Sequence, residues 1–292
     1  MKIGKEGRWA LLFITPWIIG FAVFMAYPVV VSFFYSFCDY SVLSKPVWIG
    51  LGNYRDLLDD DVFWISLRNT AVFAVFSLPL GILFSLALAA LLHLCVIGKA
   101  TFRAIFFLPS LLPIVANAII WLWIFNGEYG LFNYFLKGVF AIQPVNWLGA
   151  PNPAMAALII LGLWGVGYSI VIFLAAFQEV PTELYEAAEL DGASHFGKFR
   201  HVTIPLISPV LYFQLVMGII GVLQVFATPY IMTGGGPARS TLFYTMYLYD
   251  NAFRFLRMGY ACALAWILFI IIVTLTWAAT RLSSRYVHYQ GG

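Results

Sequence analysis

Charge is the scarcest property of this chain: only 10% of its 292 residues are Asp, Glu, Lys or Arg, whereas 62% are hydrophobic. An ordinary soluble domain is about half apolar and about one quarter charged. The mean hydropathy of +0.90 points the same way. The shortage of charge therefore excludes an ordinary soluble globular protein and assigns the chain to a lipid bilayer.

Cysteine and the recurrent motifs of enzymes are also scarce. The three cysteines, Cys38, Cys95 and Cys262, fall in or beside separate apolar blocks, so their spacing predicts neither a disulfide framework nor a zinc site. No G-x-x-x-x-G-K-[ST] occurs, and the glycine-rich run 234–236 lacks the lysine of a phosphate-binding loop. H-E-x-x-H and Ser/His/Asp arrangements are missing too. The sequence therefore predicts no metal, no cofactor and no catalytic residues in this chain.

Apolar runs long enough to cross a membrane are plentiful. A spanning helix needs about 20 largely apolar residues, and six blocks meet this requirement, at about 9–34, 70–92, 104–125, 154–177, 209–231 and 260–280. The first block is longer than the apolar part of a secretory signal and shows no clear cleavage site, so we expect it to remain as a span. The sequence therefore predicts an all-α, polytopic membrane protein with six transmembrane helices.

The basic residues orient these spans. An even number of spans places both termini on one side, and basic residues favour the cytoplasmic side. With both termini cytoplasmic, the inner segments hold nine of the 16 Lys and Arg residues: Lys2, Lys5, Arg8, Lys99, Arg103, Lys198, Arg200, Arg281 and Arg285. The pattern favours cytoplasmic termini, and it places the segment between the fourth and fifth blocks on the same side.

That segment, 181–209, is the longest polar stretch that lies between two apolar blocks away from the chain ends. Thr182 is of the residue type that caps a helix N-terminus, and Gly192 is of the type that ends a helix. We expect one short helix between them and a second from Ser194 to about Val202, stopped by Pro205 and Pro209. Two interpretations stay open: a docking surface for another subunit, or a solvated amphipathic connector.

The spacing within this segment resembles a known motif. Glu186-Ala187-Ala188, three residues, Gly192, nine residues and then Val202-Thr203-Ile204-Pro205 resemble the EAA motif, E-A-A-x3-G-x9-I-x-L-P, of permease subunits in binding-protein-dependent ABC importers. Further matches are typical of the carbohydrate-uptake branch of that family, the maltose and glycerol-3-phosphate type. They lie at 50–54, 68–70, 102–103, 107–109, 121, 130–133 and 233–237, so the resemblance covers nearly the whole chain.

The resemblance implies a single permease domain over 1–292, with a cytoplasmic coupling-helix loop at 181–205 that docks on an ATPase. The residues implied in ATPase coupling are Glu186, Ala187, Ala188, Asp191 and Gly192. Gly192 would form the corner between the two loop helices. The chain itself would be no enzyme, because partner subunits would bind ATP and Mg²⁺ and hydrolyse the ATP.

The resemblance also implies partners and a location. The partners are a second permease subunit in a heterodimer, two copies of a cytoplasmic ATP-binding subunit, an extracytoplasmic substrate-binding protein and membrane lipid, with no nucleic acid. The location is the bacterial cytoplasmic (inner) membrane, as a multi-pass protein.

The fifth apolar block has one small and polar face. Gln214, Gly218, Gly221, Gln224 and Thr228 recur at steps of three and four residues, which places them on one side of a helix. Polar side chains inside a bilayer usually face the protein interior or a water-filled path. Close helix packing through the glycines is an equally open interpretation.

The fourth apolar block adds aromatic residues that suit a sugar. Trp164 and Tyr168 offer flat faces with indole and hydroxyl groups, which match the C–H patches and the hydroxyl rim of a sugar ring. The family places its substrate pocket between the helices before and after the EAA loop, so these residues and the polar face of the fifth block are predicted to line the substrate pathway. Val222 and Val225 stand where some members have amides, which leaves open whether this subunit or its partner holds the main pocket.

The predicted function is a permease subunit of an ATP-driven importer for a sugar, an oligosaccharide or a polyol. A glycerol-3-phosphate-type importer is the first alternative. Arg239, Arg254 and Arg257 of the last outer loop could be its anion contacts, but exposed arginines on the outer face more often meet lipid headgroups or the binding protein. A polytopic membrane enzyme would need acids or histidines at its spans, and an ion-coupled carrier would need intramembrane carboxylates. The apolar blocks contain almost none of these groups, which argues against both.

Overall fold

The structure of the chain, a computed structural model, describes residues 5–94 and 98–283, with side chains from Leu12 onward. Lys2, Cys95 and Arg285 lie outside the described residues. The described chain is mostly helical, with two short strands. It divides into two compact units, residues 1–60 with 248–270 and residues 61–247 with 271–292.

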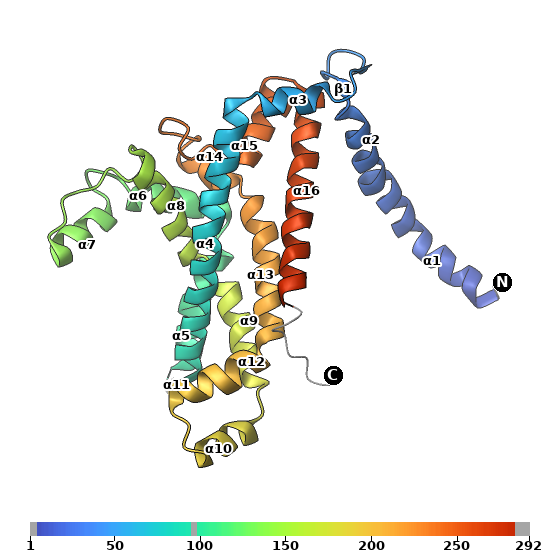
Figure 1. Cartoon of the computed structure of the whole chain (residues 1–292). Coiled ribbons are helices and arrows are strands. Elements are labelled where there is room, and N and C mark those ends of the chain that lie inside the picture. The colour runs from blue at the N-terminus through green and yellow to red at the C-terminus, as the bar shows by residue number, and fades with distance from the viewer. Residues whose placement is uncertain (1–4, 95–97, 284–292) are drawn as a thin grey trace. The chain divides into compact units, whose positions relative to one another are not determined.

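The first unit begins with a long apolar helix. α1 (Lys5–Phe21), a π-helical turn (Ala22–Ala26) and α2 (Tyr27–Tyr35) follow one another without a break (Figure 1). The apolar stretch Leu12–Tyr35 is 0% buried over its most hydrophobic window. Its side chains are therefore left for lipid or another subunit to cover.

The other elements of the first unit are held together by contacts to backbone carbonyls. Its small elements are β1 (Cys38–Asp39), β2 (Val47–Trp48), which pairs antiparallel with β1, and α3 (Gly52–Leu58). The buried Asn53 side chain donates to the carbonyls of Ser36 and Cys38, at 2.9 Å each. A Cβ at Gly259 would collide with the carbonyl oxygen of Cys38, so only glycine permits this close approach.

The second unit is a helical bundle that contains most of the chain. Its elements are α4 (Asp61–Leu94), α5 (Lys99–Phe107), a 3₁₀ turn (Leu108–Leu111), α6 (Ile114–Ile124), α7 (Leu131–Phe140), α8 (Pro151–Trp164), α9 (Gly167–Gln178), α10 (Thr182–Leu190), α11 (His195–Lys198), a π-helical turn (Phe199–Thr203), α12 (Ile204–Leu206), α13 (Ser208–Leu223) and α14 (Ala227–Met232). Of the last elements, α15 (Tyr244–Tyr249) and α16 (Met258–Ser283) continue from one unit into the other. α4 packs against α8, α9 and α13 (Figure 1).

α4 begins at Asp61, earlier than the start at 70 that we predicted for the second span. The polar residues of these extra turns are satisfied locally: the Ser66 hydroxyl donates to the Phe63 carbonyl at 2.8 Å, and the Thr70 hydroxyl donates to the Ser66 carbonyl at 2.9 Å. The Thr70 oxygen also accepts the backbone N–H of Tyr244 at 2.9 Å. Polar residues that hydropathy places outside the span therefore continue its helix.

The spans agree with the predicted fold class. Four apolar helices are long enough to cross a membrane: Leu12–Tyr35, Asp61–Leu94, Ser208–Met232 and Met258–Ser283. Two bent pairs qualify if each pair counts as one span, Lys99–Leu111 with Ile114–Ile124 and Pro151–Trp164 with Gly167–Gln178. The prediction of an all-α, polytopic protein is confirmed, with up to six spans among the described residues.

The first of the two bends has an identifiable cause. The first pair bends by 101°, and Leu112 at the break has an extended backbone, with ψ of 135°. Pro113 follows directly, and a residue before proline is driven out of the helical region. The second pair bends by 44° at Gly165 and Val166. Two of the predicted spans are therefore pairs of half-helices.

A buried apolar cluster joins α4, α9 and the start of α13. Its members are Leu86, Ala89, Leu92, Ile170, Phe173, Leu174, Ala176, Phe177, Val180 and Ile207. Tyr185 of α10 and Phe199, Val202, Ile204 and Leu206 of the following segment pack against it. The polar loop between α9 and α13 is thus attached to the core of the bundle.

Candidate functional site

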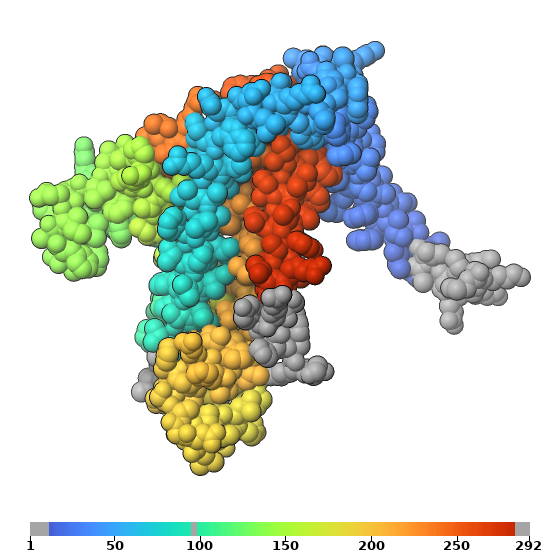
Figure 2. Space-filling model, in the orientation of Figure 1, coloured from blue at the N-terminus to red at the C-terminus, as the bar shows by residue number. Residues whose placement is uncertain are grey.

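Two short helical stretches leave the bundle after α9 and return to it at α13. The first is α10, and the second runs from α11 through the π-helical turn to α12. Figure 2 shows them projecting from one end of the bundle. We call residues 181–206 the loop knob. The predicted pair of short helices is therefore present.

Gly192 ends α10 in a Schellman arrangement. Its φ is +78°, its N–H donates to the Glu189 carbonyl at 3.0 Å, and the Ala193 N–H donates to the Ala188 carbonyl at 2.9 Å. These bonds satisfy carbonyls that the helix end leaves without partners. A Cβ at position 192 would meet nothing within 4 Å. The left-handed backbone, rather than a shortage of space, therefore requires glycine at this corner.

Two details of the predicted helices were wrong. Pro181, with ψ of 132°, occupies the N-cap position of α10, so Thr182 is already helical. The second stretch does not stop at Pro205 but continues to Leu206. Proline is tolerated there because it lies in the first turn of a new α-helical segment after the π-helical turn, where its missing N–H costs little. Ser194 caps the second stretch, accepting the Gly197 N–H at 3.2 Å.

Side chains connect the two stretches of the loop knob. The hydroxyl groups of Tyr185 and Thr203 share a hydrogen bond of 2.8 Å. Lys198 Nζ pairs with Glu189 Oε2 at 3.1 Å. Together with the packing of Tyr185 and Phe199 on the apolar cluster, these contacts make the loop knob a folded part of the bundle rather than a loose connector.

The five residues predicted to couple to an ATPase lie together on the loop knob. Glu186, Ala187, Asp191 and Gly192 are exposed, and Ala188 is half-buried. All of them belong to α10 or to the corner that follows it. The surface that these residues form is thus accessible to a partner.

Apolar side chains near these residues are exposed as well. Leu190 is 90% exposed and Phe196 is 70% exposed, and Leu184 is also open to solvent. Large apolar side chains gathered on an otherwise polar projection mark an interaction surface more often than a solvated connector. This exposure favours the docking interpretation of the segment.

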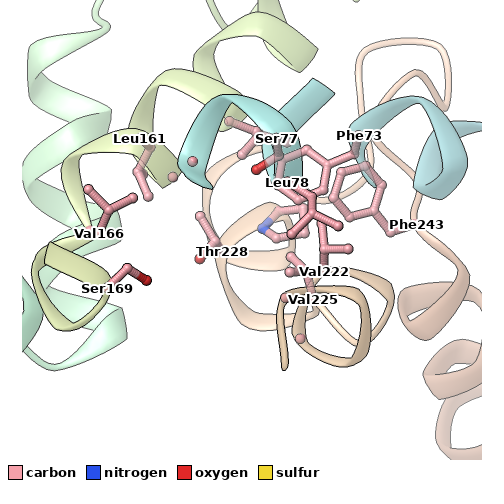
Figure 3. Close-up of a pocket in the computed structure, with 17 residues that line it drawn as sticks. Phe73, Ser77, Leu78, Leu161, Val166, Ser169, Val222, Val225, Thr228 and Phe243 are labelled. Atoms are coloured by element: carbon pink, nitrogen blue, oxygen red, sulfur yellow. The ribbon is translucent and has the colours of Figure 1, made fainter. Parts of the chain in front are cut away.

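A cavity of about 450 Å³ lies within the second unit. It is formed by α4, α8, α9, α13 and α14 and by the segment before α15, and Figure 3 shows ten of its residues by name. Its lining consists of Phe73, Ser77, Leu78, Gly81, Leu158, Leu161, Gly162, Gly165, Val166, Ser169, Gly218, Gly221, Val222, Val225, Thr228, Pro229 and Phe243. The volume is within the range of about 300–1,000 Å³ that is usual for small-molecule sites.

The cavity lies where two helices are interrupted. Gly165 and Val166, between α8 and α9, line one side, and Val225, between α13 and α14, lines another. Interrupted helices at a central site are typical of membrane transporters, because unwound backbone is tolerated where it borders a cavity. The geometry therefore supports a solute site at this position.

The predicted pathway residues divide into two groups. Gly218, Gly221 and Thr228 line the cavity. A Cβ at Gly218 would collide with Leu78 of α4, whereas one at Gly221 would meet nothing within 4 Å. Close helix packing is therefore the interpretation that applies to Gly218, whereas Gly221 faces open space, as a residue on a solute path would.

The other four predicted pathway residues are not part of the cavity lining. The Trp164 ring lies edge-to-face on Trp121, with 5.6 Å between centroids. Tyr168 is 56% exposed and its ring contacts Phe107. Gln224 is exposed at the end of α13. The structure thus separates these side chains from the cavity, although they lie on the same helices.

Gln214 is a special case among these residues. It is buried in α13, and its Nε2 atom has no hydrogen-bond partner within the described part of the chain. A buried amide without a partner costs about 1–3 kcal/mol. The amide therefore remains available to a group that the single chain does not supply.

The chemistry of the cavity is apolar with hydroxyl groups and without charge. Ser77, Ser169 and Thr228 supply the hydroxyl groups, and none of the described lining residues is ionisable. Ser77, from α4, was missed in the sequence analysis, because the pattern of one apolar block does not show which of its residues face the cavity formed with other helices. Figure 3 shows Ser77 and Phe73 on α4 near Thr228 and Val222.

Two of the three arginines considered for an anion site have other partners for their guanidinium groups. Arg254 pairs with Asp250 at 3.1 Å, and the Arg257 guanidinium lies 4.5 Å from the centroid of the Tyr260 ring. The backbone carbonyl of Arg239 accepts the Asn69 side-chain amide at 2.7 Å. None of these arginines is part of the cavity lining.

Comparison with known proteins adds independent support. Residues 77–288 match the family described as "Binding-protein-dependent transport system inner membrane component". The chain is 37% identical to the Probable ABC transporter permease protein YesP of Bacillus subtilis (strain 168), over 99% of this chain and 94% of that protein. It is 33% identical to the trehalose/maltose transport system permease protein MalF of Thermococcus litoralis, over 93% and 92%.

A solved structure shares the fold. It is a bacterial ABC transporter involved in the import of the acidic polysaccharide alginate, with a TM-score of 0.85 and 22% identity over 97% of this chain and 98% of that one. At this identity the likeness concerns the fold. The family match and the relatives confirm the resemblance found in the sequence. The chain belongs to the binding-protein-dependent transport system inner membrane components, and it is a multi-pass permease subunit of an ABC importer.

Proposed function

We propose that this permease moves an uncharged, hydroxyl-rich solute, namely a sugar, an oligosaccharide or a polyol. The observation that carries the proposal is the cavity, which offers Ser77, Ser169 and Thr228 hydroxyl groups within an apolar, uncharged lining. Hydroxyl groups pair with those of a sugar, and apolar side chains pack on its C–H faces. The names of two relatives, a trehalose/maltose and a lactose transport permease, support the same class of solute.

A phosphate ester such as glycerol 3-phosphate suits this cavity poorly. Its charge would enter a site whose described lining has no Lys, Arg or His. A buried charge without a partner costs several kcal/mol. The cavity therefore favours the sugar over the phosphate alternative.

The site is completed by a second permease subunit in a heterodimer. The cavity carries few hydroxyl groups for a sugar, and the valines Val222 and Val225 line it where amides would bind more strongly. The partner permease would supply the remaining polar groups. An extracytoplasmic binding protein would deliver the solute, and both termini of the chain would lie in the cytoplasm.

The loop knob is the docking site for a cytoplasmic ATP-binding subunit, two copies of which would hold ATP and Mg²⁺. Glu186 offers charge, Ala187 and Ala188 allow close approach, and the exposed Leu190 and Phe196 supply apolar area. Because the loop knob shares its apolar cluster with α9 and α13, closure of the ATP-binding subunits would move these helices and change access to the cavity.

The test is transport by the complete complex in proteoliposomes. We expect ATP-dependent uptake of one or more labelled neutral sugars from a panel of maltose, trehalose and lactose, and no uptake of glycerol 3-phosphate. Thr228→Val and Ser169→Ala should each raise KM by about 3- to 10-fold, because each removes one hydrogen-bonding group.

The matched control is Gln224→Leu, which changes an exposed residue at the end of the same helix outside the cavity lining. It should leave KM unchanged. Uptake of glycerol 3-phosphate in preference to every neutral sugar would overturn the proposal, as would a KM that responds to Gln224→Leu but not to Thr228→Val.

A further inference from the structure

A second cavity, of about 570 Å³, lies between the end of α4 and the loop knob. Its lining comprises Ala87, Ala90, Leu91, His93, Leu94, Phe177, Tyr185, His195, Lys198, Phe199 and Thr203. It shares no residue with the first cavity, which is proposed as the solute site. The apolar wall comes mainly from α4, and the opposite wall comes from α10, α11 and the π-helical turn.

The ionisable side chains of this groove are basic apart from the Tyr185 phenol. His93 lies near the end of α4, whereas His195 and Lys198 belong to α11. Nearby, Lys99 Nζ donates to the backbone carbonyl of His93 at 2.9 Å, which neutralises part of the negative end of α4. The polar end of the groove therefore suits an anion.

The apolar end of the groove calls for hydrocarbon. Ala87, Ala90, Leu91 and Leu94 form a continuous strip along α4, and Leu91 and Leu94 are 60% and 71% exposed. This strip is the last part of an apolar span, so it lies where the hydrocarbon region of a bilayer ends. A small soluble anion would leave the strip uncovered, whereas an acyl chain would bury it.

We infer that this groove binds an anionic phospholipid. The phosphate would lie at Lys198, His195 and His93, and one acyl chain would follow Ala87, Ala90 and Leu91 of α4. Basic pockets at the cytoplasmic ends of spans are suited to anionic lipid headgroups. The inference depends on the membrane location of the chain and not on the transported solute.

The Lys198–Glu189 ion pair should oppose the binding of a lipid phosphate. The Lys198 side chain is 14% exposed, whereas that of Glu189 is 74% exposed. A lipid phosphate would compete with the Glu189 carboxylate for the same ammonium group. Removing the carboxylate should therefore strengthen lipid binding, although Glu189 is not part of the groove lining and its replacement adds no new contact.

Because the loop knob forms one wall, a bound lipid would contact both a span and the segment that docks on the ATP-binding subunit. The composition of the membrane would then influence the position of the loop knob. Uptake in membranes without anionic lipid should be lower even when every subunit is present.

The test measures lipid binding to the purified full chain by native mass spectrometry, with phosphatidylglycerol, phosphatidylcholine and inorganic phosphate as separate probes. We expect tighter binding of phosphatidylglycerol than of phosphatidylcholine. Lys198→Gln should weaken phosphatidylglycerol binding about tenfold, the loss of one charged hydrogen bond. Glu189→Gln should strengthen it, and Lys198→Arg should retain it.

Two further variants separate the groove from general charge effects. Arg200→Gln removes the same charge two residues away, on an exposed side chain outside the groove, and should leave binding unchanged. Ala87→Trp fills the exposed apolar strip without altering charge and should abolish the tight site.

The inference is overturned if Lys198→Gln and Arg200→Gln weaken binding equally, since the effect would then be one of net charge. It is also overturned if inorganic phosphate displaces phosphatidylglycerol at equal concentration, or if Ala87→Trp binds as the unmodified chain does. Either result would mean that the acyl chain makes no contact with the strip.

Discussion

At the scale of single residues, Gly192 determines how α10 ends. With φ at +78° and open space around it, substitution strains only the backbone, by about 1–2 kcal/mol. Gly192→Asp should leave folding and membrane insertion intact but shift α10 and uncouple uptake from ATP hydrolysis. Uptake and ATPase activity of the complex, measured together, check this.

Gly197→Ala is the matched control for Gly192→Asp. It lies in the same loop knob, but its φ is not positive, and a Cβ there would meet only Ser194 Oγ at 3.4 Å and Ala193 at 3.8 Å. In this variant, uptake should remain coupled to ATP hydrolysis. Normal uptake by the Gly192→Asp variant would contradict the docking role of α10.

Gly218 and Gly221 differ in what surrounds them, and their alanine variants should differ likewise. Gly218→Ala forces the end of the Leu78 side chain to move, so it should lower the free energy of unfolding by about 1 kcal/mol. Gly221→Ala meets open space and should leave stability unchanged while narrowing the cavity. Thermal unfolding of each variant in detergent measures the change in stability.

The double variant Gly218→Ala with Leu78→Ala identifies the cause. Leu78→Ala removes the colliding group, so the two changes should be non-additive. Additive losses would show that Leu78 is not what opposes a side chain at position 218.

At the scale of secondary-structure elements, the hydrogen bond between Tyr185 and Thr203 connects α10 to the second stretch of the loop knob at 2.8 Å. Tyr185→Phe should lower the local stability of α10 by about 1 kcal/mol and raise its amide hydrogen exchange. The core of α9 should exchange as before. Tyr54→Phe is a control hydroxyl deletion far along the chain, and it should leave the exchange of α10 unchanged.

Much of this architecture was predictable from apolar run length and motif spacing, but the interruptions were not. Pro113 follows the break in the third block and Gly165 follows the end of α8, but neither residue type alone marks a break, because Pro79 lies inside the unbroken α4 and Gly162 lies inside α8. Pro205 was expected to stop a helix. It does not, because after the π-helical turn it lies in the first turn of α12, where a proline is tolerated. Local propensity does not reveal such breaks, because tertiary packing decides them.

The site was predictable to a similar extent. The EAA-like spacing located the loop knob because its residues are consecutive in sequence. The cavity draws on helices far apart in the chain, so Ser77 and Phe243 could not be assigned to it by periodicity within one block. Tyr168 shows the converse: the right helix and residue type, but a side chain directed at Phe107.

At the scale of the whole molecule, the chain is incomplete as a functional unit. Its first apolar stretch has no buried residue in its most hydrophobic window, and the loop knob exposes Leu190 and Phe196. Purification from its native membrane followed by mass spectrometry of the intact assembly should find a second permease and two ATP-binding subunits.

Leu190→Ser in the same preparation serves as the internal comparison. It should release the ATP-binding subunits and retain the second permease, because only the loop knob is altered. A chain that purifies alone, stable and without any other subunit, would contradict the importer assembly. The membrane enzyme and the ion-coupled carrier would then have to be considered again.

The two helix interruptions at the cavity proposed as the solute site have one more consequence. α9 starts just after Gly165 and Val166, α13 stops at Leu223, and the loop knob joins their other ends. The three parts therefore form a hairpin whose two tips both end at helix interruptions that border the cavity. A force on α10 that turned this hairpin as one body would act first on the walls of the cavity, while α8 and α14, which lie beyond the interruptions, could stay in place.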